Sequence, residues 1–191
     1  MSFDELADRL VVAGRAAFRE ARERNRGETF YSFALFSDVF AAYILPTCGT
    51  EEGLLRVAES YLAEFGGTVE EQAATLRWSP ADSPYHMLGE EHFEGVLELL
   101  NRRGDPWQRL DDPDRDAFDA EVEGRFEACF RALARLDEEG LFGRGAERER
   151  VVVNILQGDQ SEESILENAR RLNPPEALVR LERDMGEWAP G

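Results

Sequence analysis

The sequence predicts an α+β domain, with a small mixed or antiparallel sheet of about four strands and several helices packed against it. The first observation is the segment 30–36 (FYSFALF), which is apolar on both alternating faces. A strand covered on one side alternates apolar and polar residues, whereas a strand covered on both sides does not. The second observation is the segment 151–156 (VVVNIL), which has the clearest strand propensity in the chain. We expect these two strands to share one sheet. Five of their side chains are expected to be buried: Phe30, Phe33, Leu35, Val152 and Ile155.

Caps predict two helices in the first third of the chain. Ser2, followed three residues later by Glu5, makes a capping box, and the helix that it begins is expected to end at Gly27. Thr50 is a good N-cap, and the two acidic residues 51–52 suit the positive end of a helix dipole. These signals predict one helix before the first strand in the sequence and one helix after the hairpin that the strand begins.

Two further strands are expected near the first one. Residues 37–38 can turn the chain into a second strand at 39–45, and residues 75–78 are typical of a short third strand. Within the first strand, Phe30 is expected on the opposite face from Phe33, because successive side chains alternate. Residues 79–86 must form a loop, since two prolines interrupt any ladder or helix.

The second half of the chain is predominantly helical in pattern. A helix is expected at 91–101, and a long one begins at Asp112 and Pro113 and continues to about Glu139. Ser161 opens another helix, which the sequence Asn-Pro-Pro at 173–175 ends. A last helix is expected to carry an apolar stripe formed by Ala177, Leu178, Leu181 and Met185, and Trp188 lies just beyond it.

Length and composition bound the functional classes. The 191 residues predict one domain, spanning 1–191. The net charge of −18 argues against nucleic acid and anionic membranes as partners and permits a basic protein partner. The alternative is that the acidity serves solubility or a saline cytoplasm. Every basic side chain is arginine, which excludes lysine-dependent chemistry.

The same features predict a cytoplasmic, soluble protein. Cys48 and Cys129 lie far apart without metal-ligand spacing, so we expect two free thiols in a reducing compartment. The first residues include an early acidic pair and no apolar segment of signal-peptide length. No segment approaches the roughly 18 apolar residues of a membrane span.

The loop after residue 77 is the best candidate for a binding surface. Arg77, Trp78, Asp82 and Tyr85 come together there, and Trp, Tyr and Arg are the residue types that anchor binding surfaces. The alternative is that Trp78 fills the core and Asp82 makes a local turn bond.

A second candidate surface is the acidic start of the long helix. Asp119, Glu121 and Glu123 are predicted binding residues there. Like charges three or four residues apart repel, so these acids should destabilise the free protein unless a basic partner binds them. The alternative is that arginines of the chain, such as Arg125, already compensate them.

Neither a metal site nor a catalytic residue is predicted. His86 and His92 lie near several carboxylates, a combination that can bind Zn or Fe, but their spacing matches no metal motif. The sequence has no nucleophile elbow, phosphate loop or dinucleotide fingerprint. No cofactor is predicted, and whether the protein is an enzyme stays open, as does its oligomeric state.

Several motifs together resemble a known family. They are the residues 28–35 (ETFYSFAL), 50–54 (TEEGL), 76–82 (LRWSPAD), 136–143 (LDEEGLFG), 148–151 (RERV) and 171–175 (RLNPP). In this combination and order, the chain resembles the bacterial family called domain of unknown function 4303. Gly49 and Ser83 depart from the family pattern, which often has Asn and Trp at these places. The resemblance implies a small cytoplasmic bacterial protein and assigns no catalytic residue.

Two functional hypotheses follow. The first is a partner-binding protein, possibly an immunity protein that masks a basic toxin or effector, by analogy with other small bacterial families. The alternative is an enzyme or small-ligand-binding domain with a pocket near Trp78, Asp82, Tyr85 and His86.

Overall fold

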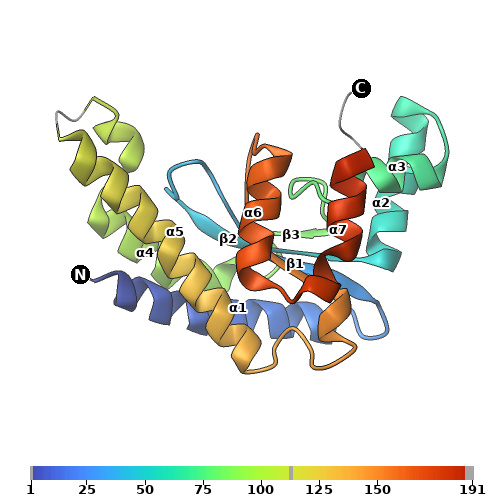
Figure 1. Cartoon of the computed structure of the whole chain (residues 1–191), viewed down its shortest axis with the longest axis horizontal. Coiled ribbons are helices and arrows are strands. Elements are labelled where there is room, and N and C mark those ends of the chain that lie inside the picture. The colour runs from blue at the N-terminus through green and yellow to red at the C-terminus, as the bar shows by residue number, and fades with distance from the viewer. Residues whose placement is uncertain (1, 112–113, 188–191) are drawn as a thin grey trace.

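A four-stranded mixed sheet forms the centre of the protein (Figure 1). The computed structural model describes residues 2–111 and 114–187. The strand order is β3-β2-β1-β4; β1 pairs antiparallel with β2 and parallel with β4, and β2 pairs antiparallel with β3. The predicted α+β class is confirmed. The strands are β1 (Phe30–Ser37), β2 (Ile44–Thr50), β3 (Tyr85–His86) and β4 (Val152–Gln157).

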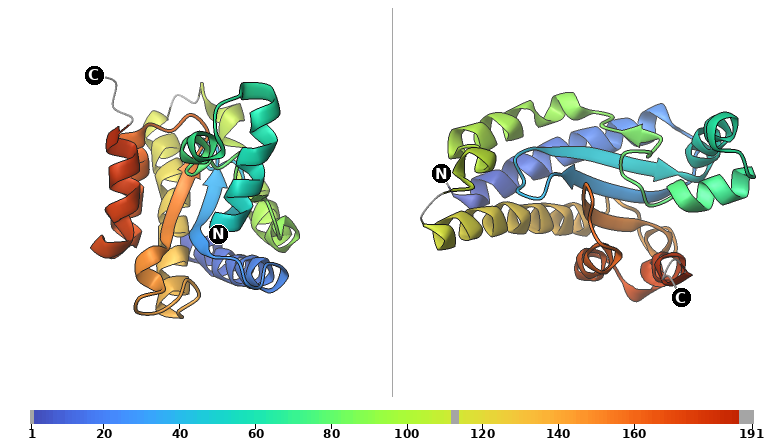
Figure 2. Two further views of the ribbon diagram at one scale, coloured as in Figure 1. Left: turned by 90° about the vertical axis from the view of Figure 1, so that its right-hand side faces the viewer. Right: turned by 90° about the horizontal axis from the view of Figure 1, so that it is seen from above.

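Helices cover both faces of this sheet. In Figure 1 the sheet is seen nearly edge-on, with α1 below it and α6 and α7 above it. Figure 2 shows from above how the four strands lie side by side. The α-helices of the described residues are α1 (Phe3–Arg24), α2 (Glu51–Phe65), α3 (Val69–Leu76), α4 (Glu94–Arg103), α5 (Arg115–Glu138), α6 (Glu162–Leu172) and α7 (Pro175–Glu187). Three short 3₁₀ turns accompany them: η1 (Glu90–Phe93), η2 (Pro106–Arg109) and η3 (Arg148–Arg150).

The larger hydrophobic core lies between one sheet face and the helices α1, α4 and α5. Phe33 is fully buried there, with its ring centre 5.2 Å from that of Phe18 and 5.4 Å from that of Phe142. Two smaller cores occupy the opposite face, one with α2 and α3 and the other with α6 and α7. All five side chains predicted to be buried are buried. The sheet is therefore covered on both faces, as the continuous apolar pattern of β1 predicted.

A β-bulge in β1 changes which face of the sheet its first side chains lie on. The register shifts between Phe30 and Ser32, and Phe30 stacks on Phe33 with ring centres 5.0 Å apart. The prediction that these two rings lie on opposite faces was wrong, because the bulge adds one residue to the alternation. Tyr31 is thereby left on the other face, in the core of α2 and α3.

Two predicted strands are wrong. Residues 39–45 mostly form the tip of the β1–β2 hairpin, where the Asp38 carboxylate accepts hydrogen bonds from the backbone of Phe40 and Ala42. The second strand begins only at Ile44. Residues 75–78 end the helix α3 instead of forming a strand, because a capping box between Thr68 and Glu71 starts that helix.

The predicted loop 79–86 is wrong at its end, because Tyr85 and His86 form β3 and pair with β2. The other predicted boundaries agree to within a few residues. Ser2, Thr50 and Ser161 cap α1, α2 and α6 as expected. The first helix ends at Arg24 instead of Gly27. The long helix α5 has Asp114 as its N-cap; the predicted start at residues 112–113 lies outside the described residues, as does Trp188.

The outer edge of β4 is bonded to side chains. Asn173 donates a hydrogen bond of 2.6 Å to the carbonyl of Val153 and accepts one of 2.8 Å from its N–H. Asn168 donates to the carbonyl of Ile155 at 3.1 Å. The amide of Asn173 thus bonds to β4 as the backbone of a neighbouring strand would.

Candidate functional site

Arg77, the first of the four residues predicted to form the binding surface, is almost fully buried, with 8% exposure. Its guanidinium donates hydrogen bonds of 2.9 and 2.6 Å to the Glu51 carboxylate and lies 4.6 Å from the centre of the Tyr31 ring. The Tyr31 hydroxyl donates a 2.9 Å hydrogen bond to the Arg77 carbonyl, and burial raises the pKa of Tyr31 well above its usual range. Arg77 therefore joins the end of α3 to β1 and α2, and its charge is balanced within the chain.

Trp78 lies between the two smaller cores and contacts both of them. Its ring meets the Tyr31 ring edge-on, with centres 5.6 Å apart, and its indole N–H donates a 3.1 Å hydrogen bond to Asp184 in α7. Trp78 is only half-buried. It partly fills the core, as the alternative interpretation held, and it also lines a hollow in the surface.

Asp82 bonds both within its own loop, as the alternative interpretation held, and to α2, whereas Tyr85 bonds to other parts of the chain. The Asp82 carboxylate accepts hydrogen bonds from the hydroxyls of Tyr61 and, at 2.6 Å, Ser79. The Tyr85 hydroxyl donates to Glu28 at 2.5 Å and accepts from Arg56 at 2.8 Å. The four predicted loop residues therefore do not converge on one site.

Glu28 is the centre of a polar network at the start of β1. Its carboxylate accepts hydrogen bonds of 2.5 Å from Thr50 and Tyr85 and pairs with Arg56 at 2.8 Å. Burial opposes the charged form, but these three partners outweigh it and lower the pKa of Glu28. The network ties β1, α2 and β3 together and was not foreseen, because its members are distant in sequence.

A hollow lies over the second face of the sheet, beneath the loop that contains Trp78. Its cavity volume is about 20 Å³. The strands supply its floor, the loop 78–83 one wall and α6 and α7 the other. The described residues that line it are Ser32, Ala34, Thr47, Trp78, Ser79, Pro80, Ser83, Val152, Asn154, Leu156, Ile165 and Leu181.

The three acids predicted as binding residues on α5 differ in their surroundings. Asp119 and Glu123 are exposed, and Asp119 pairs with Arg115 at 3.3 Å. Glu121 is partly buried and accepts hydrogen bonds of 2.7 and 2.6 Å from Arg103 and 2.8 Å from Arg125. Burial opposes the charge of Glu121, but the two arginines outweigh this and lower its pKa. The expected net repulsion therefore applies to Asp119 and Glu123 and not to Glu121.

Arg125 joins three segments behind this acidic surface. It is 1% exposed and donates to Glu121, to the Ala41 carbonyl at 3.1 Å and to the Gly104 carbonyl at 2.8 Å. Ala41 belongs to the β1–β2 hairpin, and Gly104 follows α4. The guanidinium thus fixes the hairpin tip against the turn between α4 and η2.

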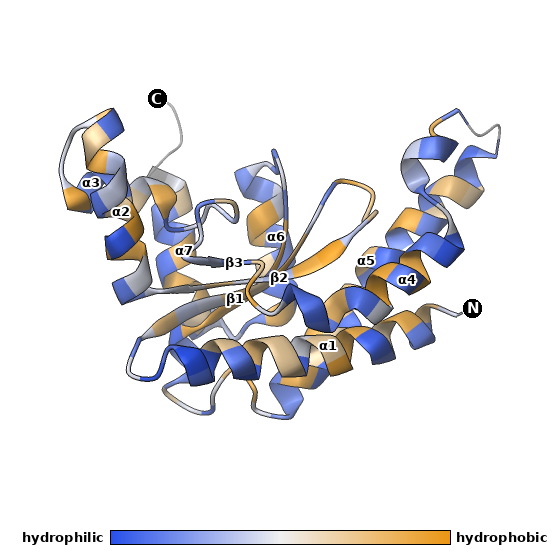
Figure 3. Ribbon diagram, turned by 180° about the vertical axis from the view of Figure 1, so that it is seen from behind, coloured by the Kyte–Doolittle hydropathy of each residue, from blue (hydrophilic) through white to orange (hydrophobic). Residues whose placement is uncertain are grey.

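Exposed apolar side chains occur at this hairpin tip and on the η2 segment, whose Trp107 packs against the tip, and we call them the Trp107 patch: Val39, Trp107 and Leu110. Their exposed fractions are 47%, 52% and 39%. Trp107 packs edge-on against Phe40, with ring centres 4.8 Å apart, and its indole donates a 2.6 Å hydrogen bond to Asp38. Figure 3 shows the hairpin coloured as strongly hydrophobic. The analysis of the sequence missed this patch, although a tryptophan directly after Gly-Asp-Pro was a signal that it lay outside a helix.

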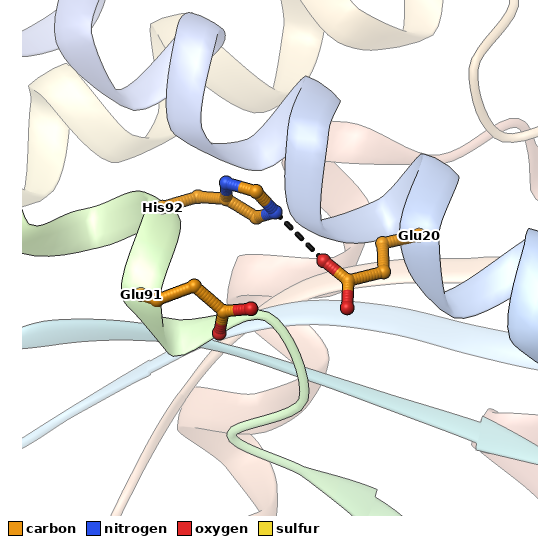
Figure 4. A group of neighbouring side chains, drawn as sticks. All are labelled: Glu20, Glu91 and His92. Carbon is orange, nitrogen blue, oxygen red and sulfur yellow. Dashed lines mark hydrogen bonds and ion pairs between the residues drawn. The ribbon is translucent and has the colours of Figure 1, made fainter.

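The two histidines do not share a site. His86 packs edge-on to Phe36 at 5.0 Å, whereas His92 bonds to Glu20 of α1 at 2.7 Å. The ligand atoms of Glu20, Glu91 and His92 lie within 4.8 Å of one another (Figure 4). Glu20 also pairs with Arg24 at 2.6 Å, so its carboxylate is balanced within the chain.

Comparisons with known proteins identify a family. Residues 10–174 match the model of the family described as "Domain of unknown function (DUF4303)". No curated protein and no solved structure matches the chain. Across residues 2–111 and 114–187, none of the helices has both the length and the apolar character needed to cross a membrane.

Proposed function

The chain belongs to the DUF4303 family, and from that premise we propose that it is a partner-binding protein whose partner is basic. The observation that carries the proposal is the Trp107 patch beside the acidic start of α5. Neighbouring exposed apolar side chains are more informative than a single one, and Trp is among the side chains that most often dominate binding energy.

Charge around the patch supports a basic partner. Residues 105–123 contain eight acidic residues and two arginines. The whole chain has 40 acidic residues and a net charge of −18. Within this segment, Asp119 and Glu123 are exposed on the first turns of α5. The negative electrostatic field of these residues speeds the approach of a basic protein and disfavours acidic ones. The Trp107 patch supplies apolar surface that a partner would bury on binding.

The patch is also held rigidly from behind, which limits the entropy lost on binding. Phe40 packs between the rings of Trp107 and Phe118, at 4.8 and 5.6 Å. Arg125 bonds the hairpin backbone from inside. In its finer form, the proposal is that the protein acts in the cytoplasm and masks a basic toxin or effector, without binding nucleic acid or membrane.

The test is affinity capture from an extract of the source cells at low and high salt. Wild type, Trp107→Ala and Phe65→Ala are compared as baits. Phe65 is a matched control, because it is an aromatic side chain with 62% exposure on a different element, α2. We expect a basic protein that wild type and Phe65→Ala retain at low salt, and that Trp107→Ala binds at least about tenfold more weakly.

High salt should weaken the capture by screening the acidic field. The proposal is overturned if no basic protein is retained at low salt, or if Trp107→Ala retains it as well as Phe65→Ala does. The second outcome would assign the capture to net charge alone.

A further inference from the structure

The hollow beneath the Trp78 loop has a floor of small side chains. Register places Thr47 of β2 and Asn154 of β4 on either side of Ala34 of β1. A residue with only a methyl group thus lies between two polar ones at the centre of the sheet face. Ser32 lines the floor one step further along β1. This arrangement leaves a depression where a larger residue at position 34 would fill the space.

The walls are apolar or neutral. Trp78 and Pro80 stand on one side, and Ile165 and Leu181 on the other. None of the twelve described residues that line the hollow is charged, although 32% of the chain's residues are. A charged ligand group would lose its hydration there without gaining a counter-charge.

Most polar atoms around the hollow already have partners. The hydroxyl of Ser83 donates to the Cys48 carbonyl at 2.6 Å, and the Asn154 amide donates to the Ile165 carbonyl at 3.1 Å. The hydroxyl of Thr47 differs in being buried without a partner: Thr47 is 3% exposed, and its hydroxyl forms no hydrogen bond among the described residues. A buried hydroxyl without a partner costs about 1–3 kcal/mol.

The free space matches one polar group. About 20 Å³ admits a single water-sized group. A larger molecule could place only its tip there, with its body against the neutral walls beside Trp78.

We propose that the hollow is a binding site for a small uncharged molecule with a hydroxyl or amide at its tip and an apolar body. The tip bonds to Thr47, and the body packs against the indole of Trp78. This site is separate from the Trp107 patch and does not depend on the proposed protein partner.

Four probes of one ring size test the proposal: benzyl alcohol, toluene, benzoate and benzylamine. Binding is followed by NMR through the indole N–H signal of Trp78, which the hydrogen bond to Asp184 holds in place. Wild type is compared with Thr47→Val, which removes the hydroxyl, and with Thr47→Ser, which keeps it. Thr75→Val is the matched control, because Thr75 is exposed and lies outside the hollow.

We expect wild type to bind benzyl alcohol about fivefold more tightly than toluene, and both charged probes at least about tenfold more weakly. Thr47→Val should lose the preference for the alcohol, whereas Thr47→Ser and Thr75→Val should keep it. The proposal is overturned if benzyl alcohol does not move the Trp78 signal, if Thr47→Val keeps the preference, or if benzoate or benzylamine binds equally well. The comparison of probes in wild type stands even if a variant does not fold.

Discussion

Replacement of Arg125 by methionine should strongly destabilise the protein. Methionine keeps much of the apolar stem and removes the guanidinium, which is 1% exposed and has three partners. The carbonyls of Ala41 and Gly104 would each lose a donor, and Glu121 would keep only Arg103.

The size of the expected loss in stability follows from the polar groups that stay buried when the guanidinium is removed. Glu121 keeps Arg103, so its charge stays compensated and the main cost lies at the carbonyls of Ala41 and Gly104. Each unsatisfied buried carbonyl costs about 1–3 kcal/mol. With the weakened ion pair added, we expect Arg125→Met to lower the free energy of unfolding by about 3–5 kcal/mol.

Urea unfolding followed by circular dichroism measures this loss. Arg131→Met is the control, since the ion pair of Arg131 with Asp4 has side chains 44% and 78% exposed. Such surface pairs contribute about 0–1 kcal/mol. A loss below about 1 kcal/mol for Arg125→Met, or one no larger than that of Arg131→Met, would refute the argument that this guanidinium fixes the hairpin tip.

Three other predictions concern stability. Phe33→Ala should cost about 3–5 kcal/mol in urea unfolding, because the side chain is fully buried among aromatic rings; a loss below about 1 kcal/mol would mean that the core tolerates the cavity. Replacing Asp119 and Glu123 together by Asn and Gln should raise the melting temperature in low salt, with the gain shrinking as salt is added; an unchanged gain in high salt would exclude repulsion as the cause. Arg103 and Arg125 lower the pKa of Glu121 despite its burial. The ionised carboxylate therefore stabilises the fold fully above the unfolded-state pKa of about 4.3, and this stabilisation is lost as pH falls through the folded-state pKa. The stability difference between wild type and Glu121→Gln should therefore shrink below about pH 4, and a difference that grew on acidification would contradict the assignment.

Local signals explain what the sequence analysis predicted correctly. Caps such as Thr50 and Ser161 act on the backbone two or three residues away, so the helix starts could be identified from the residues alone. The continuous apolar pattern of β1 likewise depends only on its own residues and predicted its burial on both faces.

The features that were missed arise between distant segments. The bulge at Phe30 shows only in the pairing of β1 with Thr50 and its neighbours. Arg125 reaches a carbonyl 84 residues away, which no spacing rule predicts. The hollow depends on the register that sets Thr47 and Asn154 beside Ala34, so the sequence analysis could single out Trp78 but not the space beneath it.

The asparagine bonds along β4 bear on how this protein can meet other chains. A sheet edge with free N–H and C=O groups can add a strand from a partner or seed edge-to-edge aggregation. Here Asn173 already occupies both backbone groups of Val153, and Asn168 occupies the carbonyl of Ile155. At the opposite edge, β3 offers only two residues. Strand addition is therefore blocked at Val153 and Ile155 of β4 and has only two residues available at β3, so the asparagine side chains oppose edge-to-edge aggregation of the sheet.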